Sequence, residues 1–416
     1  MTGSTGGHRL RILFFSQRFL YPMDTGGKIR TTKLLENLKN VFDVTVISNF
    51  EPGKDDRYLS RMQELCSEYH PVPWREIPKY SLGFYLRTLW RSFSRYPVTV
   101  VNDYSPDLES KLLEVAAKGP FDLLICDFLQ PTLNFRRVKG VPTLLFLHNV
   151  ESVITRRHFE VAGNPFTKFF WWRQWVKMDR YEREACRRFS AVVAVSDVDR
   201  EILEKQMGAK KVGAIPTGVD AKYFTPGNGP IEENSLVFTG AMDWLPNEDG
   251  ILFFAREILP RISVEIPDVR LTVVGRNPSA RLAEELKGYP EIRAVGRVDD
   301  IRPWVSRHVL YVVPLRIGGG TRIKIYEAMA MGKAVVSTRI GAEGLPVTSG
   351  HDVILADRPE DFARAVVRLL RNGEERRRLE DAARSYVEEN ASWECAAETF
   401  ARLCRAAAQE AAPEPW

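Results

Sequence analysis

RIGGGTRIKIYEAMAMGKAVVST, residues 316–338, combines glycines, cations, one carboxylate and a run of β-branched residues. The glycines at 318–320 let the backbone approach a ligand closely, because glycine has no Cβ atom. A helix is expected to begin near Thr321 and to lead into the apolar run at 334–338, which is typical of a buried strand. The stretch therefore predicts one loop, helix and strand of a parallel α/β sheet.

The start of this helix is suited to an anion, because N-terminal N–H groups lack helical partners and carry partial positive charge. Lys324 lies in the first turn, where its charge opposes the helix dipole by roughly a few tenths of a kcal/mol unless a phosphate is bound. Glu327 shares a face with Lys324, and its carboxylate can accept hydrogen bonds from a ribose diol. The alternative is an ordinary surface ion pair, worth about 0.2–0.5 kcal/mol.

Further apolar runs alternate with helical patterns along the chain, as in doubly wound parallel sheets. One series lies at 11–16, 43–48, 122–127, 142–148 and 191–196, and a second at 235–240, 270–275, 310–315 and 334–338. We expect an α/β protein with a Rossmann-like domain over 1–215, a Gly- and Pro-rich linker over 216–230, and a second Rossmann-like domain over 231–390. The two domains should face each other across a cleft, with functional residues after the strands.

Composition agrees with two soluble domains. The 416 residues are 44% hydrophobic and 27% charged, and the five cysteines are scattered without a C-x-x-C spacing. This pattern favours a reducing cytosol and argues against a disulfide framework or a zinc site. No segment resembles a signal peptide or a membrane span, so we expect a cytoplasmic protein whose membrane contact, if any, is peripheral, on the inner face of the cell membrane. The net charge of +5 weakly favours anionic ligands, and we expect no nucleic-acid partner.

Two nucleotide-binding classes are excluded by spacing. A nicotinamide dehydrogenase needs G-x-G-x-x-G directly after a strand, whereas the first strand is followed by SQRFLYPMDTGGKIR. A P-loop kinase needs G-x-x-x-x-G-K-[ST], which PMDTGGKI does not match.

The motifs taken together resemble those of family 4 glycosyltransferases, retaining enzymes of the GT-B fold. The resemblance covers most of the chain and rests on residues 318–338, YPMDTGGKIR (21–30), HNVES (148–152), IPTGVDAKYFTPG (215–227), LVFTGAMDWLPNEDG (236–250) and SWE (392–394). It implies that a C-terminal helix over 391–416 completes the first domain.

The resemblance also implies a donor site. Glu327 would bind the nucleotide ribose, and Arg297 would frame the nucleobase. His148 would lie beside the transferred sugar, and we favour this over the alternative that the residue caps the helix that follows. The diphosphate would be bound by the glycine-rich helix start, by nearby cations and by glycines of other loops, namely Gly319, Gly320, Thr321, Arg322, Lys324, Gly240, Gly26 and Gly27. We take His148, Arg322 and Lys324 as the catalytic set.

Two departures from the family pattern affect this site. The family usually has a glutamate eight residues before the ribose-binding carboxylate, where this chain has Gly319. The loop after Gly240 reads Ala-Met-Asp-Trp, without the usual Arg and Lys. We therefore expect Arg322 and Lys324 to supply the phosphate-binding charge, and the identity of the sugar stays open.

The function implied is metal-independent, cofactor-free transfer of a sugar, with retention, from a nucleoside-diphosphate sugar to a hydroxyl acceptor. UDP is the expected nucleotide. The acceptor would be a glycan or a lipid-linked precursor in cell-surface polysaccharide or glycolipid synthesis. Two alternatives stay open: a nucleotide-sugar epimerase of the GT-B fold, and a catalytically silent nucleotide-sugar-binding module.

Three further features have competing explanations. The aromatic and basic segment 164–184, and FYLRTLWRSFSRYP at 84–97, either pack in the first domain or bind an anionic membrane. The aspartate pairs at 197/199 and 299/300 either cap helices or bind a metal, and we expect caps. Asp127, at a strand end, serves either a turn or the site.

Overall fold

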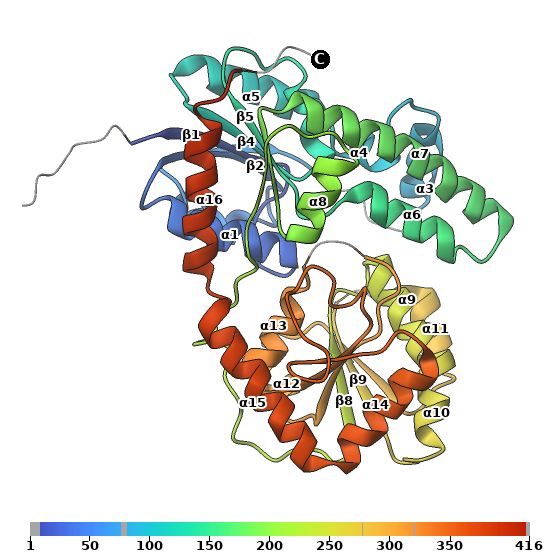
Figure 1. Ribbon diagram of the computed structural model, residues 1–416. Helices are drawn as coiled ribbons and strands as arrows, with labels where there is room; N and C mark the ends of the chain where they lie inside the picture. Colours follow the sequence, from blue (N-terminus) through green and yellow to red (C-terminus); the bar gives the residue numbers. More distant parts are fainter. Residues whose placement is uncertain (1–8, 76–80, 277, 319–320, 413–416) are drawn as a thin grey trace, which may run out of the picture. The chain divides into compact units, whose positions relative to one another are not determined.

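The computed structural model describes residues 9–75, 81–276, 278–318 and 321–412. The chain divides into two compact units, Met1–Ile215 together with Ala396–Trp416, and Pro216–Cys395. Each unit contains one parallel sheet with helices around it (Figure 1). The expected α/β class with two Rossmann-like domains is therefore confirmed.

The first unit has a seven-stranded sheet in the order β3-β2-β1-β4-β5-β6-β7. The strands are β1 (Arg11–Ser16), β2 (Asp43–Phe50), β3 (Glu68–Pro73), β4 (Leu123–Asp127), β5 (Thr143–Phe146), β6 (Ala191–Ala194) and β7 (Val212–Ala214). Strands β4 and β5 are buried along their whole length, which explains why they are apolar without alternation. The strand order reverses between β1 and β4, and ligands bind at such a point in open α/β sheets.

The helices of this unit include α1, which begins at the first-loop glycines, and α7, the longest of the group. Their bounds are α1 (Gly26–Leu38), α2 (Leu59–Gln63), α3 (Leu82–Ser92), α4 (Val98–Asp103), α5 (Pro106–Lys118), α6 (Glu151–Val161), α7 (Pro165–Arg188), α8 (Asp197–Lys205) and α16 (Trp393–Ala407). Helices α6 and α7 are joined by the buried carboxylate of Glu182, which accepts the backbone N–H groups of Glu151 (2.8 Å) and Ser152 (2.9 Å). This carboxylate caps the N-terminus of α6.

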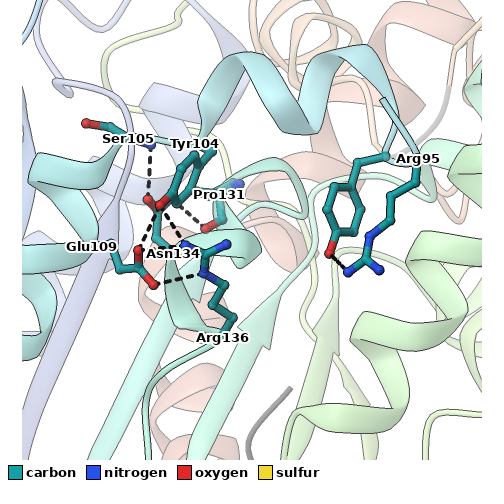
Figure 2. A network of polar contacts seen from close by, with 8 residues as sticks. Arg95, Tyr104, Ser105, Glu109, Pro131, Asn134 and Arg136 are labelled. Carbon is teal, nitrogen blue, oxygen red and sulfur yellow. Dashed lines mark hydrogen bonds and ion pairs between the residues drawn. The ribbon is translucent and has the colours of Figure 1, made fainter. Parts of the chain in front are cut away.

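A polar network fixes the start of α5 in the same unit (Figure 2). The Tyr104 hydroxyl donates to Glu109 at 2.8 Å, and Arg136 donates both to Glu109 (Nε, 3.1 Å) and to the Tyr104 oxygen (2.8 Å). Asn134 accepts the backbone N–H of Ser105 at 3.2 Å. Because Glu109 is buried, these partners compensate the cost of removing its charge from water.

The second unit has a six-stranded sheet in the order β10-β9-β8-β11-β12-β13. Its strands are β8 (Ser235–Thr239), β9 (Arg270–Val274), β10 (Ile292–Gly296), β11 (Leu310–Val313), β12 (Ala334–Ser337) and β13 (Ile354–Leu355), and its helices are α9 (Leu245–Phe253), α10 (Leu259–Ser263), α11 (Ala280–Leu286), α12 (Arg302–Ser306), α13 (Ile323–Ala330), α14 (Pro359–Arg371) and α15 (Gly373–Asn390). Here the order reverses between β8 and β11, so the chain segments that follow these two strands flank the switch point.

The contacts place two segments, the linker at 216–230 and the start of the C-terminal helix, within the second unit. The linker predicted at 216–230 begins inside the second unit, where Val219 belongs to the core and its N–H donates to the Ala391 carbonyl at 2.9 Å. Gly218 packs so closely under Trp393 that an added Cβ would lie 2.6 Å from the indole. The first residues of α16 therefore belong to the second unit, and only the part from Ala396 onward joins the first.

The part of α16 that joins the first unit packs through apolar side chains. Phe400 is completely buried, with its ring 4.8 Å from that of Phe146. Leu403 lies over Gly213, and the Arg405 guanidinium lies 5.1 Å from the Phe42 ring. Helix α16 thereby covers residues of β5 and β7.

The structure contains edge strands that the sequence patterns did not predict, namely β3, β7 and β13. Strands β7 and β13 are short, and β3 is largely exposed. Buried apolar runs cannot signal strands of this kind. In the described ranges, none of the helices is long and apolar enough to cross a membrane.

Candidate functional site

The predicted phosphate-binding residues of the second unit lie around the switch point between β8 and β11. Gly240 follows β8, and the loop after β11 leads into α13, an eight-residue helix that begins at Ile323. Lys324 is therefore the second residue of the helix, in the first turn as expected. Gly319 and Gly320 lie outside the described residues.

Lys324 contacts the loop after β8. Its Nζ donates to Oδ1 of Asn247 at 3.0 Å, and Nδ2 of Asn247 donates to the Ala241 carbonyl at 2.8 Å. The ammonium also lies 4.1 Å from the centroid of the Phe238 ring, a cation–π contact. An added Cβ on Gly240 would lie 2.7 Å from Lys324 Nζ, so a side chain at 240 would displace the cation.

Gly240 is held in place by a second glycine. A Cβ atom on Gly275, which follows β9, would lie 1.7 Å from the Gly240 carbonyl oxygen. No side chain can be accommodated there unless the backbone moves. Gly275 was not predicted as a site residue, because a lone glycine after a strand does not reveal what approaches it.

Burial shifts the pKa values of Lys324 and Glu327 toward each other. Burial and the nearby Arg322 charge lower the pKa of Lys324 to about 7, against an opposing effect of Glu327. Burial raises the pKa of Glu327 to about 7, and Lys324 opposes that rise. Lys324 and Glu327, which were predicted to share one helix face, therefore interact through their charges. Both groups titrate near neutral pH, which is typical of functional sites.

Arg322 and Thr321 immediately precede the helix. Arg322 is buried, and its guanidinium carbon lies 5.4 Å from the centroid of the Trp244 ring. Gly318 makes room for this guanidinium, because an added Cβ would lie 1.8 Å from Nη2. Thr321 shares a hydrogen bond with Thr217 through their hydroxyls. Arg322 and Lys324 thus lie beside the loop that lacks the family's usual cations.

Arg297 follows β10, and its side chain is exposed. The neighbouring Asp300 accepts from Arg302, with Oδ2 to Nη2 at 2.7 Å. In the other aspartate pair, Asp197 accepts from Arg200 at 3.0 Å, while Asp199 accepts the Ser196 hydroxyl at 2.8 Å. Within the described residues, no three or more His, Cys, Asp or Glu side chains gather as a set of metal ligands.

His148 of the first unit is the centre of a buried polar network at the ends of β1, β4 and β5. Its Nε2 lies 2.8 Å from Oδ1 of Asp127, and its Nδ1 lies 3.2 Å from Nη1 of Arg30. Because the guanidinium can only donate, Nδ1 accepts and Nε2 carries the proton. The other oxygen of Asp127 accepts from Thr31 (3.0 Å) and Ser16 (3.1 Å).

The His148 ring is only 3% exposed. Burial, reinforced by Arg30, lowers its pKa to about 4, although Asp127 acts in the opposite direction. The ring is therefore neutral at physiological pH, and both nitrogens are engaged by residues of the same unit. This geometry makes His148 an organiser of the surrounding loops. Its predicted contact with a sugar hydroxyl stays a prediction.

Phe128 connects His148 to the first-loop glycines. Its φ of 72° lies in the left-handed region, which is uncommon for a bulky residue and costs conformational energy. The Phe128 ring stacks on His148 with centroids 3.8 Å apart and an interplanar angle of 9°. A Cβ on Gly27 would lie 2.5 Å from this ring, so Gly27 permits the close approach of α1. Gly26 is the first residue of α1.

Two family models match the chain, and the matches do not overlap. One, described as Glycosyltransferase Family 4, matches residues 102–223, a range that includes His148. The other, described as Glycosyl transferases group 1, matches residues 233–372, a range that includes Lys324 and Glu327. Together they extend over more than half of the chain.

Two curated relatives match over most of the chain, and a third matches over less than half of it. An uncharacterized 44.6 kDa protein in the cps region of Klebsiella pneumoniae is 21% identical over 394 residues, which are 91% of this chain and 96% of that protein. The MMP alpha-(1->4)-mannosyltransferase of Mycolicibacterium hassiacum is 27% identical over 402 residues, 89% of this chain and 92% of that enzyme. The phosphatidyl-myo-inositol mannosyltransferase of Mycolicibacterium smegmatis is 29% identical over 189 residues, 43% of this chain and 47% of that enzyme.

Solved structures agree on the fold. Sucrose-phosphate synthase from Thermosynechococcus elongatus superposes with a TM-score of 0.73 at 18% identity, over 96% of this chain and 99% of that one. Anabaena HepE in complex with UDP-glucose has a TM-score of 0.69 at 14% identity, over 96% of this chain and 100% of that one. From the family matches, the relatives and the shared fold, we conclude that the chain is a glycosyltransferase of family 4 with the GT-B fold.

Proposed function

We propose that the enzyme transfers a sugar from a nucleoside-diphosphate sugar, with UDP as the nucleotide, to a hydroxyl acceptor. The observation that carries this proposal is the arrangement of Lys324, Arg322 and Glu327 at the start of α13, beside Gly240. A helix N-terminus with two cations suits a diphosphate, and a carboxylate one turn further suits a ribose diol. The structural neighbour HepE has been solved with UDP-glucose, which supports the choice of nucleotide.

In this proposal the second unit stabilises the leaving group. Cleavage of the bond between the sugar carbon and the diphosphate oxygen leaves negative charge on the diphosphate. Arg322, Lys324 and the N–H groups at the start of α13 would stabilise that negative charge. A positive charge held in place before the reaction needs little reorganisation when the charge develops. We propose that this replaces a metal ion, so that transfer needs no metal and no other cofactor.

Retention of configuration is the stereochemical outcome we propose. The acceptor oxygen would form its bond to the sugar carbon on the face from which the diphosphate leaves. The acceptor's proton would pass to the leaving phosphate oxygen, so that the products are the glycoside and the free nucleoside diphosphate. The chain's own residues would orient the reactants, and none of them would form a covalent intermediate.

We assign His148 and the first-loop glycines to the reaction as well. Gly26 and Gly27, at the start of α1, would let backbone N–H groups approach the phosphates, while His148 would help place the transferred sugar. Its contacts with Asp127 and Arg30 support a positioning role, because they fix the ring orientation and tautomer. Arg297 would frame the nucleobase through its backbone.

For the acceptor we propose a glycan or a lipid-linked precursor in cell-surface polysaccharide or glycolipid synthesis. The cps-region relative and the phosphatidyl-myo-inositol mannosyltransferase support this class. We further propose that the enzyme works in the cytoplasm, at the inner face of the cell membrane. No nucleic acid takes part.

Calorimetric titration with UDP, GDP, ADP and CMP in the presence of EDTA tests the donor site, with Glu327→Ala as control. Tight binding of UDP alone, lost in Glu327→Ala, is the expected result. Binding of none of the four by a folded protein would overturn the proposal. Incubation with a nucleotide sugar then separates transfer, which yields a new glycoside, from epimerisation, which yields an isomerised nucleotide sugar.

A further inference from the structure

Helix α3 of the first unit exposes its apolar residues. None of its side chains is buried, and Trp90 is 81% exposed. The exposed apolar residues recur at the spacing of one helix face, which continues past the C-terminus of α3 to Phe93: Leu82, Tyr85, Leu86, Leu89, Trp90 and Phe93. An amphipathic helix of a globular domain normally turns its apolar face toward the core. Helix α3 has the opposite orientation, with its apolar face toward solvent.

The polar side of α3 holds the helix on the rest of the unit. Nη1 of Arg91 donates to the Val101 carbonyl at 3.0 Å and to Oδ1 of Asn102 at 2.9 Å, both at α4. The apolar face is therefore left toward solvent by a specific set of contacts. It is not the result of an unattached helix.

The neighbouring helix α7 is apolar on two faces, of which one is packed. Trp171 stacks on His158 of α6 at 4.4 Å, and Trp175 stacks on Phe159 at 5.9 Å. The other face is exposed along Phe166, Phe169, Trp172 and Val176, and Phe166 is 88% exposed. The two explanations of segment 164–184 thus apply to different faces of one helix.

The exposed faces of α3 and α7 meet where α3 ends. Nζ of Lys177 donates to the carbonyls of Ser92 (2.7 Å) and Ser94 (2.5 Å). The Arg173 guanidinium lies 5.9 Å from the centroid of the Phe93 ring. Figure 1 shows the two helices in the same part of the first unit. We call the exposed apolar side chains of α3, α7 and Phe93 the docking face.

The charges around the docking face have one sign. Residues 81–102 contain three arginines and no acidic residue, and residues 161–178 contain Lys168, Arg173 and Lys177 and likewise no acidic residue. Trp and Tyr with basic residues are typical of helices that lie in the headgroup region of a membrane. A second copy of the chain would bring two sets of like charges together, which opposes self-association.

We propose that the docking face binds the surface of an anionic lipid bilayer. Trp90, Leu86 and Phe166 would enter the boundary between headgroups and acyl chains, and the surrounding cations would contact the lipid phosphates. This inference rests on the proposed function, which includes a lipid-linked acceptor. It adds the surface through which the enzyme would reach that acceptor.

Flotation of the full chain with vesicles tests the proposal. We expect binding to vesicles of phosphatidylcholine and phosphatidylglycerol in equal parts, weak binding to phosphatidylcholine alone, and a decrease with added salt. The variant Leu86→Glu/Trp90→Glu should weaken binding by about ten-fold or more. The matched control is Val264→Glu, which places the same charge on a residue of the second unit that is 83% exposed.

A second pair of variants tests the charges. Neutralising Arg95 and Lys168 with glutamine should weaken binding by about five-fold for each cation removed, whereas the same change at the exposed lysines Lys210 and Lys222 should have little effect. A melting curve establishes that each variant is folded. The conservative variant Trp90→Phe provides a further test. Spin-labelled lipid should quench the tryptophan fluorescence of this variant less than that of the wild type.

Three results would overturn the proposal: no binding to anionic vesicles, equal binding by Leu86→Glu/Trp90→Glu, or a dimer that this variant dissociates in the absence of lipid. Nucleotide titration of the same proteins separates the two proposals. Vesicle binding without UDP binding would overturn the proposed function and leave the docking face in place. UDP binding that is unchanged in the variant, together with lost vesicle binding, supports both.

Discussion

Lys324 and Asn247 form a hydrogen bond of 3.0 Å that joins the start of α13 to α9. Asn247 in turn donates to the Ala241 carbonyl at 2.8 Å. Because a carboxamide is neutral, it orients the lysine without the electrostatic pull that a carboxylate would exert. Lys324 therefore keeps a pKa of about 7, set mainly by burial.

Nucleotide binding should take up protons above neutral pH. At pH 8 the free Lys324 is mostly neutral, and a bound diphosphate raises its pKa by stabilising the charged form. We expect uptake of up to about one proton per nucleotide at pH 8 and weaker binding as the pH rises from 7 to 9. Calorimetry in two buffers of different ionisation enthalpy measures the uptake. Equal uptake in Lys324→Met would contradict the assignment.

Removal of the Lys324 charge should also slow the reaction. We expect Lys324→Ala to reduce turnover by roughly 10²- to 10³-fold, because it removes a preorganised cation from the leaving group. Steady-state kinetics with the donor identified by calorimetry is the measurement. The exposed Lys222 provides a matched lysine-to-alanine control in the same unit. Wild-type turnover in Lys324→Ala would refute the role.

Asn247 should act as a positioning residue. Asn247→Ala leaves the ammonium without its orienting partner, and we expect kcat/KM to fall by about 10- to 100-fold. Asn247→Asp should behave differently, because a carboxylate beside Lys324 raises the lysine pKa and removes the proton uptake at pH 8. A purely structural role would change melting temperature in both variants without this difference in proton uptake.

Glu327→Gln should weaken nucleotide binding and stabilise the free protein. The folded-state pKa of Glu327 is about 7, above its ordinary value of 4.5. The folded state therefore holds the proton more tightly, and stability is lost as the pH rises from 4.5 through 7. At pH 8 the variant should gain roughly 1 to 3 kcal/mol in free energy of unfolding. Denaturant titrations at pH 5 and pH 8 check that the gain appears only at the higher pH.

His148→Ala should impair transfer more than nucleotide binding, because the residue belongs to the first unit. The free energy of unfolding should also depend on pH, because His148 titrates at a different pH in the folded and the unfolded chain. The folded pKa of about 4 lies below the ordinary 6.5, so the unfolded chain binds more protons between these values, and stability falls as the pH drops from 6.5 to 4. His148→Gln should show a shallower dependence in this window. An identical slope in both proteins would argue against a buried, neutral His148.

Several site features could be predicted from the sequence for simple reasons. Lys324 and Glu327 share a face because their separation is fixed by helix geometry. The central strands are buried on both faces, so their residues form continuous apolar runs. These features can be predicted because each depends only on the residue spacing within one helix or strand and on the elements next to it.

Other features depend on contacts that spacing does not contain. Asn247 meets Lys324 across 77 residues, and Phe128 adopts a positive φ that no property of phenylalanine suggests. The apolar stripe of α3 is visible in the sequence, but a stripe facing the core and one facing solvent have the same periodicity. The exposure of the apolar side chains and the contacts of Arg91 show which way the helix is turned.

The division of α16 has a consequence for synthesis on the ribosome. Residues 216–395 form a continuous segment, so the second unit can fold as soon as it emerges. The first unit is completed only after the second has been synthesised, because Phe400, which covers Phe146, follows residue 395 in the sequence. Until then its sheet would expose apolar surface to chaperones and proteases. The first unit is thus completed after the second.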